Sequence, residues 1–339
     1  MISILQKTIE RFDKGYELAP SDAEAVLDAL ISESDISVIA KVLTAWHRKG
    51  IESDEIYEFA KIMRDRMNRV NSNHDRIADI VGTGGSKAKT FNVSTAASFV
   101  VAGAGLPVAK HGNKAATSNS GSSDVLSELG IDPAVAPQIA ERCLNEVGIC
   151  FLFAPNYHRL SPTLAKVRRG LGFPTIFNCV GPLCNPASAT HQLIGVWEER
   201  LVPKMAEALC RLGTTRSWVV FGENGLDEIA ISGKTFVAEV NGGVRTFEIH
   251  PEYFEMGRST SNRLRSDDPA HSAQMIRNVL LGRPHDESAE SIVLLNAAAA
   301  LFIAGAAPTP EDAAALASES LDSGRAHAKL MELAELITV

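Results

Sequence analysis

The stretch Ile77–Gly85 (IADIVGTGG) decides the fold. Its first five residues are mostly apolar and predict a short buried strand, and the glycines that follow predict a tight loop. A helical run, Ser94–Gly103, comes after this loop. A strand, a glycine-rich loop and a helix in this order are typical of an α/β sheet whose loops lie at the carboxyl ends of the strands.

The same alternation continues toward the C-terminus. Further strands are expected at Leu106–Ala109, Gly148–Ala154, Gln192–Trp197 and Ser217–Phe221, and helices at Ser122–Leu129, Val202–Leu212 and His271–Leu281. Thr235–Ile249 has Asn-Gly-Gly in its middle and predicts a β-hairpin added to the sheet, and Thr309 predicts the cap of a late helix. We therefore expect an α/β fold with a central mixed sheet.

The N-terminal 70 residues are patterned as helices instead. Ser21 and Glu24 predict a capping box, Gly50 predicts the end of a helix, and Ser53 predicts the cap of the next one. Apolar ridges on a small helical bundle often pack against a twin subunit, so a homodimer is expected here. A basic helical segment, Ser161–Asn178, is expected to fold back onto this bundle.

Composition excludes several classes of protein. The 339 residues include 33 Lys and Arg against 41 Asp and Glu, and the formal charge of −8 disfavours binding of nucleic acid over the whole surface. The five cysteines form no CxxC pair, which is typical of reduced thiols in a cytoplasmic protein. No secretion signal is recognised at the start, and the apolar run Ile292–Ala306 is shorter than the roughly 18–20 residues of a membrane span.

Two loops after predicted strands could bind phosphate. Residues 82–95 combine glycines with Asn92, Ser94 and Thr95, so backbone N–H groups, short polar side chains and a helix start converge. The alternative is a plain tight turn, because the pattern matches neither GxGxxG nor GxxxxGK[ST]. Residues 110–124 offer lysines, hydroxyls and amides, and could otherwise be a solvated polar loop.

Two smaller features could complete a site. Asp227 and Glu228 follow another strand and supply hard oxygen ligands of the kind that Mg2+ takes beside substrate phosphates, although such a pair is usually a solvated turn. Arg168 could pair with a substrate carboxylate through its guanidinium fork, or could be an ordinary arginine on a helix surface. No Ser-His-Asp or Cys-His nucleophile pattern is present.

In their order along the chain, seven motifs resemble those of the anthranilate phosphoribosyltransferase family of tryptophan biosynthesis: GTGG, TFNVST, VAKHGNKA, SGSSDVLSELG, VRRGLGFPTIFN, GPLCNP and GLDEI. The resemblance implies a transferase that moves the phosphoribosyl group from phosphoribosyl pyrophosphate to anthranilate, giving N-(5-phosphoribosyl)anthranilate and pyrophosphate. It also implies a pair of Mg2+ ions, a homodimer, and a fold like that of nucleoside phosphorylases and phosphoribosyltransferases, with no covalent catalytic nucleophile.

The resemblance further implies a division of the chain and of its site. Residues 1–70 with about 161–190 would form a helical domain for dimerisation and the acceptor, and 71–160 with 191–339 an α/β domain for the donor. The residues implied to hold phosphoribosyl pyrophosphate are Gly82, Gly85, Ser86, Thr90, Asn92, Val93, Ser94, Thr95, Lys110, His111, Gly112, Asn113, Lys114, Ala115, Ala116, Thr117, Ser118 and Ser122. Those implied to contact anthranilate are Gly82, Asn113, His158 and Arg168, and those for the metal are Ser94, Asp227 and Glu228.

This chain departs from the family pattern at three positions. Ser86 replaces the aspartate that usually follows GTGG, which removes one acidic group near the metal; Lys114 replaces an arginine and Cys184 a threonine. Two alternative functions stay open at this point. One is a pyrimidine nucleoside phosphorylase, which has a similar architecture, and the other is a non-catalytic relative that binds nucleic acid.

Overall fold

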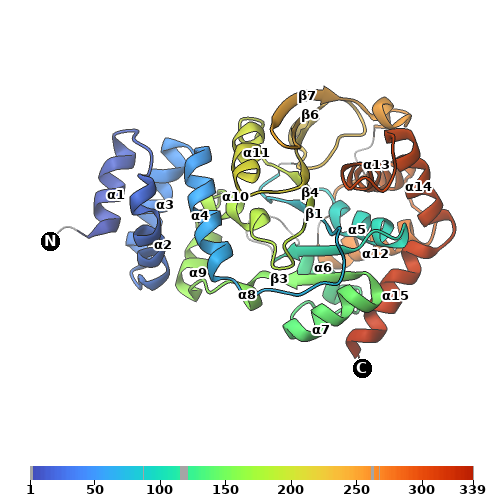
Figure 1. Ribbon diagram of the computed structural model, residues 1–339, viewed down its shortest axis with the longest axis horizontal. Coiled ribbons are helices and arrows are strands. Elements are labelled where there is room, and N and C mark those ends of the chain that lie inside the picture. Colours follow the sequence, from blue (N-terminus) through green and yellow to red (C-terminus); the bar gives the residue numbers. More distant parts are fainter. Residues whose placement is uncertain (1–2, 87, 115–120, 261–262, 267, 339) are drawn as a thin grey trace.

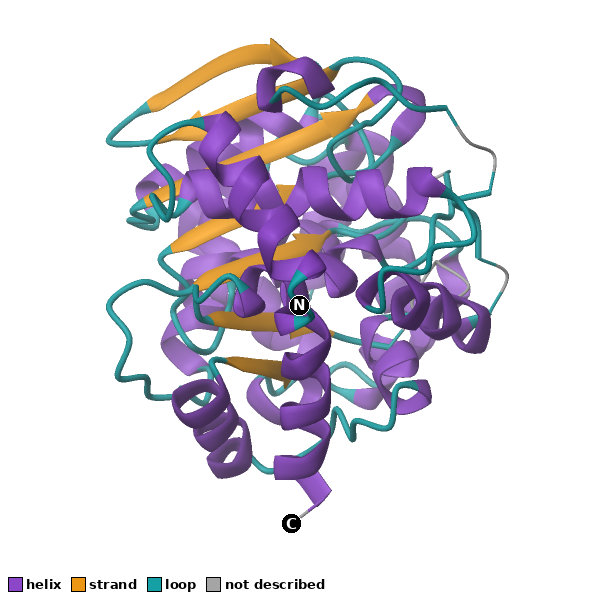
Figure 2. Ribbon diagram, turned by 90° about the vertical axis from the view of Figure 1, so that its right-hand side faces the viewer, coloured by secondary structure: helices purple, strands orange, loops and turns teal. Residues whose placement is uncertain are grey.

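The computed structural model describes residues 3–86, 88–114, 121–260, 263–266 and 268–338. Its centre is a seven-stranded sheet in the order β3-β2-β1-β4-β5-β6-β7, as Figures 1 and 2 show. The strands are β1 (Ala78–Gly82), β2 (Val108–Gly112), β3 (Ile149–Phe153), β4 (His191–Gly195), β5 (Arg216–Gly222), β6 (Thr235–Val240) and β7 (Val244–Ile249). β1 to β5 pair in parallel and the β6–β7 hairpin pairs antiparallel, so the predicted mixed sheet is confirmed.

Helices lie before, between and after the strands (Figure 1). The first group is α1 (Ile4–Asp13), η1 (Pro20–Asp22), α2 (Ala23–Ser32), α3 (Ile36–Lys49) and α4 (Ser53–Arg66). The middle group is α5 (Val93–Gly103), α6 (Ser122–Glu128), α7 (Pro137–Arg142), η2 (Cys143–Val147), α8 (Ala154–Tyr157), α9 (Pro162–Leu171), α10 (Ile176–Leu183), α11 (Leu201–Arg211), η3 (Glu223–Gly225) and η4 (Pro251–Phe254). The last group is α12 (Pro269–Leu280), α13 (Glu287–Ile303), α14 (Pro310–Asp322) and α15 (Arg325–Thr338).

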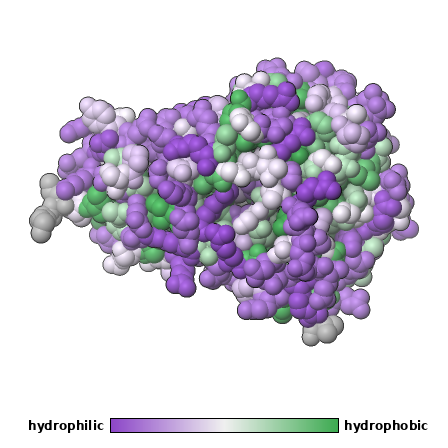
Figure 3. Space-filling model, viewed as in Figure 1, coloured by the Kyte–Doolittle hydropathy of each residue, from purple (hydrophilic) through white to green (hydrophobic). Residues whose placement is uncertain are grey.

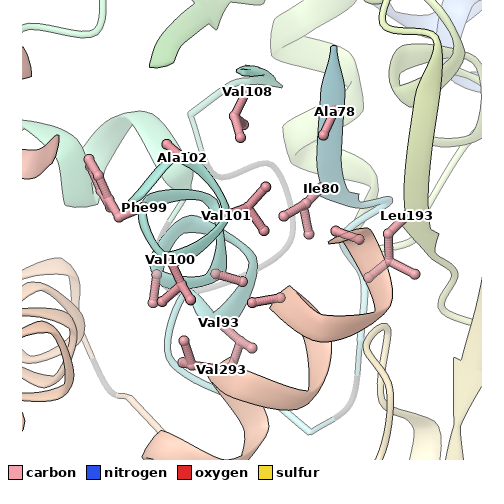
Figure 4. Packing of buried hydrophobic residues seen from close by; sticks show 14 of the residues in the cluster. Ala78, Ile80, Val93, Phe99, Val100, Val101, Ala102, Val108, Leu193 and Val293 are labelled. Carbon is pink, nitrogen blue, oxygen red and sulfur yellow. The ribbon is translucent and has the colours of Figure 1, made fainter. Parts of the chain in front are cut away.

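One face of the sheet packs against α5 and α13. Every residue of α5 except Ser94 is buried, which is what an apolar helix in the middle of a core requires. Figure 4 shows Val101 of α5 close to Ile80 of β1, with Val293 of α13 in the same cluster below them. Among the described residues, no helix combines the length and apolar character that a membrane span needs, and α13 serves as a core helix.

A second apolar cluster joins the N-terminal helices to the other face of the sheet. It includes Trp46 and Phe59 from the N-terminal helices, Phe177 from α10 and Ile194 from β4. α9 contacts α3 and α10 contacts α4, so the segment 161–178 folds back onto the N-terminal helices as predicted (Figure 1). The second cluster therefore holds α9 and α10 in place, facing the carboxyl ends of the strands.

Three local expectations were wrong. Ser21 makes no capping box, because Pro20 starts a 3-10 turn that runs directly into α2. Ser53 does not cap α4; Glu52 and Glu55 form the capping box there. The second strand begins two residues later than predicted and extends through Lys110 and His111, which pair in register with β3. Lys110 and His111 are polar, so the apolar pattern that predicts a buried strand is missing at these two positions.

The Glu55 carboxylate is a buried organising group of the N-terminal helices. It accepts hydrogen bonds from the backbone N–H of Leu18 at 2.8 Å, from Trp46 Nε1 at 2.8 Å and from Lys49 Nζ at 2.8 Å. We expect Glu55→Gln to lower the free energy of unfolding by about 3–5 kcal/mol, because an uncompensated Lys49 charge would remain buried. Urea unfolding measures this loss.

A matched control is Glu146→Gln, since Glu146 pairs with Arg142 on the surface. Exposed ion pairs contribute about 0–1 kcal/mol to stability. The free energy of unfolding of this control should therefore be close to that of the original protein. Equal stability of the Glu55 and Glu146 variants would show that the buried carboxylate does not organise the bundle.

Candidate active site

A cavity of about 570 Å3 lies at the carboxyl ends of the parallel strands. Its floor is the loops after β1, β2 and β5, and its far wall is α9 and α10 with Met63 of α4. This edge of a parallel sheet is where α/β proteins bind ligands. The sequence predictions placed both phosphate loops, the acidic pair and Arg168 here, and all of them line the cavity in part.

Glycines at the ends of two neighbouring strands leave the space that Asp227 occupies. Gly82 pairs with Gly195 across β1 and β4, and a Cβ on Gly195 would lie 1.5 Å from the Asp227 carbonyl oxygen. A Cβ on Gly82 would lie 2.6 Å from Asp227 Oδ2. Gly85 has φ of +85° and approaches Pro174, so the loop needs glycine there as well. The glycine pattern therefore brings the acidic loop against the first phosphate loop.

The start of α5 contributes the polar groups predicted from the sequence. Ser94, Thr90 and Asn92 line the cavity, and the Asn92 backbone N–H donates to Ser272 Oγ at 2.9 Å. Val93 and Thr95 are fully buried and do not line it, and Thr95 Oγ1 has no hydrogen-bond partner among the described residues. The helix N-terminus faces the cavity with its backbone N–H groups, which suits an anion.

Lys110 is a buried cation between the sheet and this helix start. Its Nζ donates to the Ile80 carbonyl and, at 3.0 Å, to Ser94 Oγ. Burial lowers the pKa of Lys110 to about 8, and the charges of Asp79, Glu228 and Asp227 partly oppose that shift. Burial likewise raises the pKa of Asp79 to about 6, although Asn185 Nδ2 donates to it at 2.8 Å. The cation thus lies within a buried polar layer under the cavity.

The acidic pair lies at the floor of the cavity. Burial raises the pKa of Asp227, and burial together with the Asp227 charge raises the pKa of Glu228. Thr90 Oγ1 donates to Glu228 at 3.4 Å, and Ser86 Oγ donates to the Gly225 carbonyl at 2.8 Å in the same loop as Asp227. Two carboxylates held close together away from bulk water favour a bound cation.

These groups fit Mg2+ rather than a softer metal. Among the described residues, no group of three or more His, Cys, Asp or Glu side chains could hold a metal alone. Mg2+ suits a site with one or two carboxylates because it keeps waters and binds substrate phosphates. Asp227, Glu228 and the Ser94 hydroxyl supply that donor set on the cavity side.

The opposite wall carries Arg168. Its guanidinium lies 5.1 Å from the Phe177 ring centre, its Nε is shielded from solvent, and that Nε has no hydrogen-bond partner among the described residues. Burial lowers the pKa of Arg168 to about 10, and the neighbouring charge of Arg169 adds to the shift. A half-buried guanidinium with an unused donor is well suited to a carboxylate ligand. Its interpretation as an ordinary surface arginine is therefore disfavoured.

The remaining predicted residues occupy the second loop and its surroundings. His158 and His111 lie side by side in the wall, and Asn113 and Lys114 are exposed at the rim. Gly112 leaves space for Ser122 Oγ, which would lie 2.2 Å from a Cβ at that position. Ala115, Ala116, Thr117 and Ser118, and also Lys87, lie outside the described residues.

Sequence reasoning missed several residues of the cavity. Asn178 Nδ2 donates to the Thr83 carbonyl at 3.0 Å and ties α10 to the glycine loop. Arg169 and Ser266 line the cavity, as does Lys89 within the predicted loop 82–95, and Gly195 lies directly against the acidic loop. Gly195 ends its strand as Gly82 does, so a strand-terminal glycine was a signal that could have been used.

Comparison with known proteins agrees with this geometry. Residues 74–327 match the model of the glycosyl transferase family, a/b domain. Anthranilate phosphoribosyltransferase of Nitrobacter hamburgensis is 43% identical over 331 residues, covering 97% of each chain, and that of Anaeromyxobacter sp. is 43% identical over 341 residues, covering 99% of each.

Solved structures give the same result. Anthranilate phosphoribosyltransferase from Thermus thermophilus superimposes with a TM-score of 0.88 at 35% identity, covering 98% of this chain and 99% of that one. The Saccharomyces cerevisiae enzyme in complex with PRPP and Mg superimposes with a TM-score of 0.87 at 28% identity, covering 98% of each chain.

The fold and the polar cavity at its sheet edge thus define a glycosyl transferase with an α/β domain. Within that class, the chain belongs to the anthranilate phosphoribosyltransferase family. The comparisons support this family and neither a pyrimidine nucleoside phosphorylase nor a nucleic-acid-binding relative.

Proposed function

We propose that this chain transfers the phosphoribosyl group of phosphoribosyl pyrophosphate to the amine of anthranilate. The observation that carries the proposal is the cavity itself, which has the acidic pair and the glycine loop on one side and Arg168 on the other. The acidic pair and the glycine loop suit a phosphorylated donor with its metal, and Arg168 suits the carboxylate of an aromatic acceptor. Family membership adds support.

The donor would lie along the two loops and the start of α5. Backbone N–H groups after Gly82 and at the N-terminus of α5, with Lys110 beneath them, are suited to phosphate oxygens. We assign to this role the implied residues that line the cavity, and also 115–118 outside the described residues, whereas Val93 and Thr95 are buried behind the cavity surface and would support the start of α5. Lys114 supplies a charge without the guanidinium fork of the usual arginine.

Asp227, Glu228 and Ser94 would hold Mg2+, and we propose two ions per site as the resemblance implied. When bound, the ions would stabilise the negative charge of the leaving pyrophosphate. Ser86, in place of the usual aspartate, donates to the Gly225 carbonyl and adds no carboxylate to the site. This chain would therefore bind metal through fewer acidic groups than its family pattern provides.

The acceptor would lie against Arg168, Asn113 and Gly82, with His158 beside it. Arg168 would pair with the anthranilate carboxylate and thereby aim the amine at the ribose. Breaking the bond between C1 and the pyrophosphate oxygen leaves positive charge on the ribose, so positioning and electrostatics carry the reaction. No covalent intermediate with the protein is needed.

We also propose that residues 1–70 with about 161–190 act as a helical domain that dimerises, and that 71–160 with 191–339 bind the donor. Tyr16 and Ile36 on the N-terminal helices are 60% and 47% exposed, and apolar patches are visible over these helices in Figure 3. The five cysteines are free thiols, which supports a cytoplasmic location.

The test of the proposed function follows anthranilate fluorescence in the presence of phosphoribosyl pyrophosphate and increasing Mg2+. We expect a loss of signal that depends on both. A folded protein that leaves anthranilate unchanged but splits thymidine or uridine with phosphate would contradict the proposal.

Replacing Arg168 tests the acceptor side. Because a hydrogen bond to a charged group contributes about 1.5–3 kcal/mol, Arg168→Ala should raise the KM for anthranilate roughly 10- to 100-fold. The KM for phosphoribosyl pyrophosphate should change little. Arg159→Ala is the control, since Arg159 is exposed and lies outside the cavity lining. An unchanged acceptor KM in the Arg168 variant would reject its role.

A further inference from the structure

A buried carboxylate lies beneath the cavity without lining it. Asp79 belongs to β1, between apolar neighbours, and its side chain is fully buried. Burying a charge in a sheet is costly unless hydrogen bonds compensate it. The partners of the Asp79 carboxylate therefore indicate why a charged group is kept at this position.

Three N–H donors use both oxygens of Asp79. Oδ1 accepts from the His111 backbone N–H at 3.3 Å, and Oδ2 accepts from Asn185 Nδ2 at 2.8 Å and from Gln192 Nε2 at 3.3 Å. Both amide nitrogens are fixed as donors, because each also donates to a backbone carbonyl, at 2.7 and 2.9 Å. An asparagine at position 79 would turn an N–H group toward a donor in either orientation. Only a carboxylate satisfies all three donors.

Two of these partners also contact the wall of the cavity. Gln192 Nε2 donates to the Pro182 carbonyl, and His111 Nδ1 lies 3.1 Å from the Gly181 carbonyl oxygen, to which it donates. Both carbonyls are among the last four of α10, which a helix leaves without the usual intrahelical partners. Gly181 and Pro182 line the cavity. Asp79 is thus linked to the cavity wall through the groups that bind the C-terminal end of α10.

The other end of α10 lies against the proposed acceptor side. The Arg168 guanidinium lies 5.1 Å from the ring centre of Phe177 on α10. Asn178 Nδ2 donates to the Thr83 carbonyl and ties this end of the helix to the glycine loop. With the contacts around Asp79 at its C-terminal end, α10 is fixed to the sheet at both ends.

We propose that Asp79 is a positioning residue for the acceptor, holding the end of α10 at its place above the strands through Gln192 and His111. This inference rests on the proposed function. Among the described residues, the Asp79 side chain makes no hydrogen bond to the glycine loop, the start of α5 or the acidic pair. Its loss should therefore weaken binding of anthranilate more than binding of phosphoribosyl pyrophosphate.

Two variants test this role. Gln192→Met keeps the length of the side chain but removes the donor to Pro182 and Asp79, and it should raise the KM for anthranilate about 10-fold. Asp79→Asn should raise that KM roughly 10- to 100-fold, because hydrogen bonds to a charged group are stronger. The KM for phosphoribosyl pyrophosphate should change little in the Gln192 variant and by a clearly smaller factor in the Asp79 variant.

Glu239→Gln is the matched control for lost stability. Glu239 is also a buried carboxylate in a strand, where it accepts from Trp218 Nε1 at 3.1 Å and pairs with Arg216 at 2.7 Å, but it lies outside the cavity lining. This variant should melt at a lower temperature and keep both KM values. It separates a weakened fold from a displaced cavity wall.

Hydrogen exchange adds a readout that is independent of activity. In the Gln192 variant, backbone amides of residues 180–185 should exchange faster than in the original protein, whereas those of α5 should not. Gln192→Met carries both measurements if Asp79→Asn does not fold.

The outcomes separate this inference from the proposed function. If the original protein does not consume anthranilate, the proposed function fails. If it does, an unchanged KM for anthranilate in the Gln192 variant, an equal rise for both substrates, or unchanged exchange at the end of α10 would overturn the role of Asp79 alone.

Discussion

Replacement of Asp227 by Asn and Glu228 by Gln in one protein is expected to lower kcat by about 10²–10³-fold. Metal charge at a leaving group contributes several kcal/mol to transition-state stabilisation, and these two carboxylates are the acidic groups at the cavity floor. The amides keep the shape but lose the charge. Steady-state kinetics over a Mg2+ titration measures the effect.

The same variant should lose the pH dependence of Mg2+ binding. Because the pKa of each carboxyl is raised, protons compete with Mg2+ for these oxygens, and the apparent affinity for Mg2+ should rise with pH in the original protein. Glu248→Gln is the control, because Glu248 lies on the hairpin and pairs with Lys234 at the surface. Wild-type turnover and Mg2+ dependence in the double variant would reject the metal assignment.

Gly195→Ala is expected to have a comparably large effect without removing any polar group. Its Cβ would lie 1.5 Å from the Asp227 carbonyl oxygen and 2.2 Å from the carbonyl carbon, so the backbone of the acidic loop must shift. Displacing a catalytic group by about 1 Å can cost about 100-fold in rate. We therefore expect at least that loss of kcat, with a higher Mg2+ requirement.

The control for this substitution is Gly243→Ala in the β6–β7 turn. A Cβ there meets nothing within 4 Å, and this glycine does not have positive φ. Thermal melting of both variants separates a shifted loop from a lost fold. A Gly195 variant with wild-type kcat and Mg2+ requirement would show that the acidic loop does not depend on this close approach.

The sheet was predictable because its strands are apolar and end in recognisable loops. The apolar run Ile77–Val81 predicted a buried strand, and the Asn-Gly-Gly turn within Thr235–Ile249 predicted a hairpin. Lys110 and His111 did not, because a buried strand that carries site residues breaks the apolar pattern. The caps at Ser21 and Ser53 failed for a different reason, since neighbouring Pro20 and Glu52 compete for the same helix starts.

The candidate site was predictable in its members but not in its geometry. Short-range motifs identified Asp227, Glu228 and Arg168 as chemically suitable residues. The seat of Asp227 on Gly195, the tie between Asn178 and Thr83, and the pairing of His111 with His158 join segments that lie far apart in the chain. Such contacts depend on the tertiary fold and leave no local signal.

The central claim is that one cavity joins phosphoribosyl pyrophosphate to anthranilate. 31P NMR of the purified protein with both substrates and Mg2+ tests it most directly. We predict that pyrophosphate and a new phosphomonoester appear in equal amounts, matched by the anthranilate consumed, and that neither appears without anthranilate or Mg2+. Pyrophosphate released without loss of anthranilate, or no reaction by the folded protein, would contradict the account.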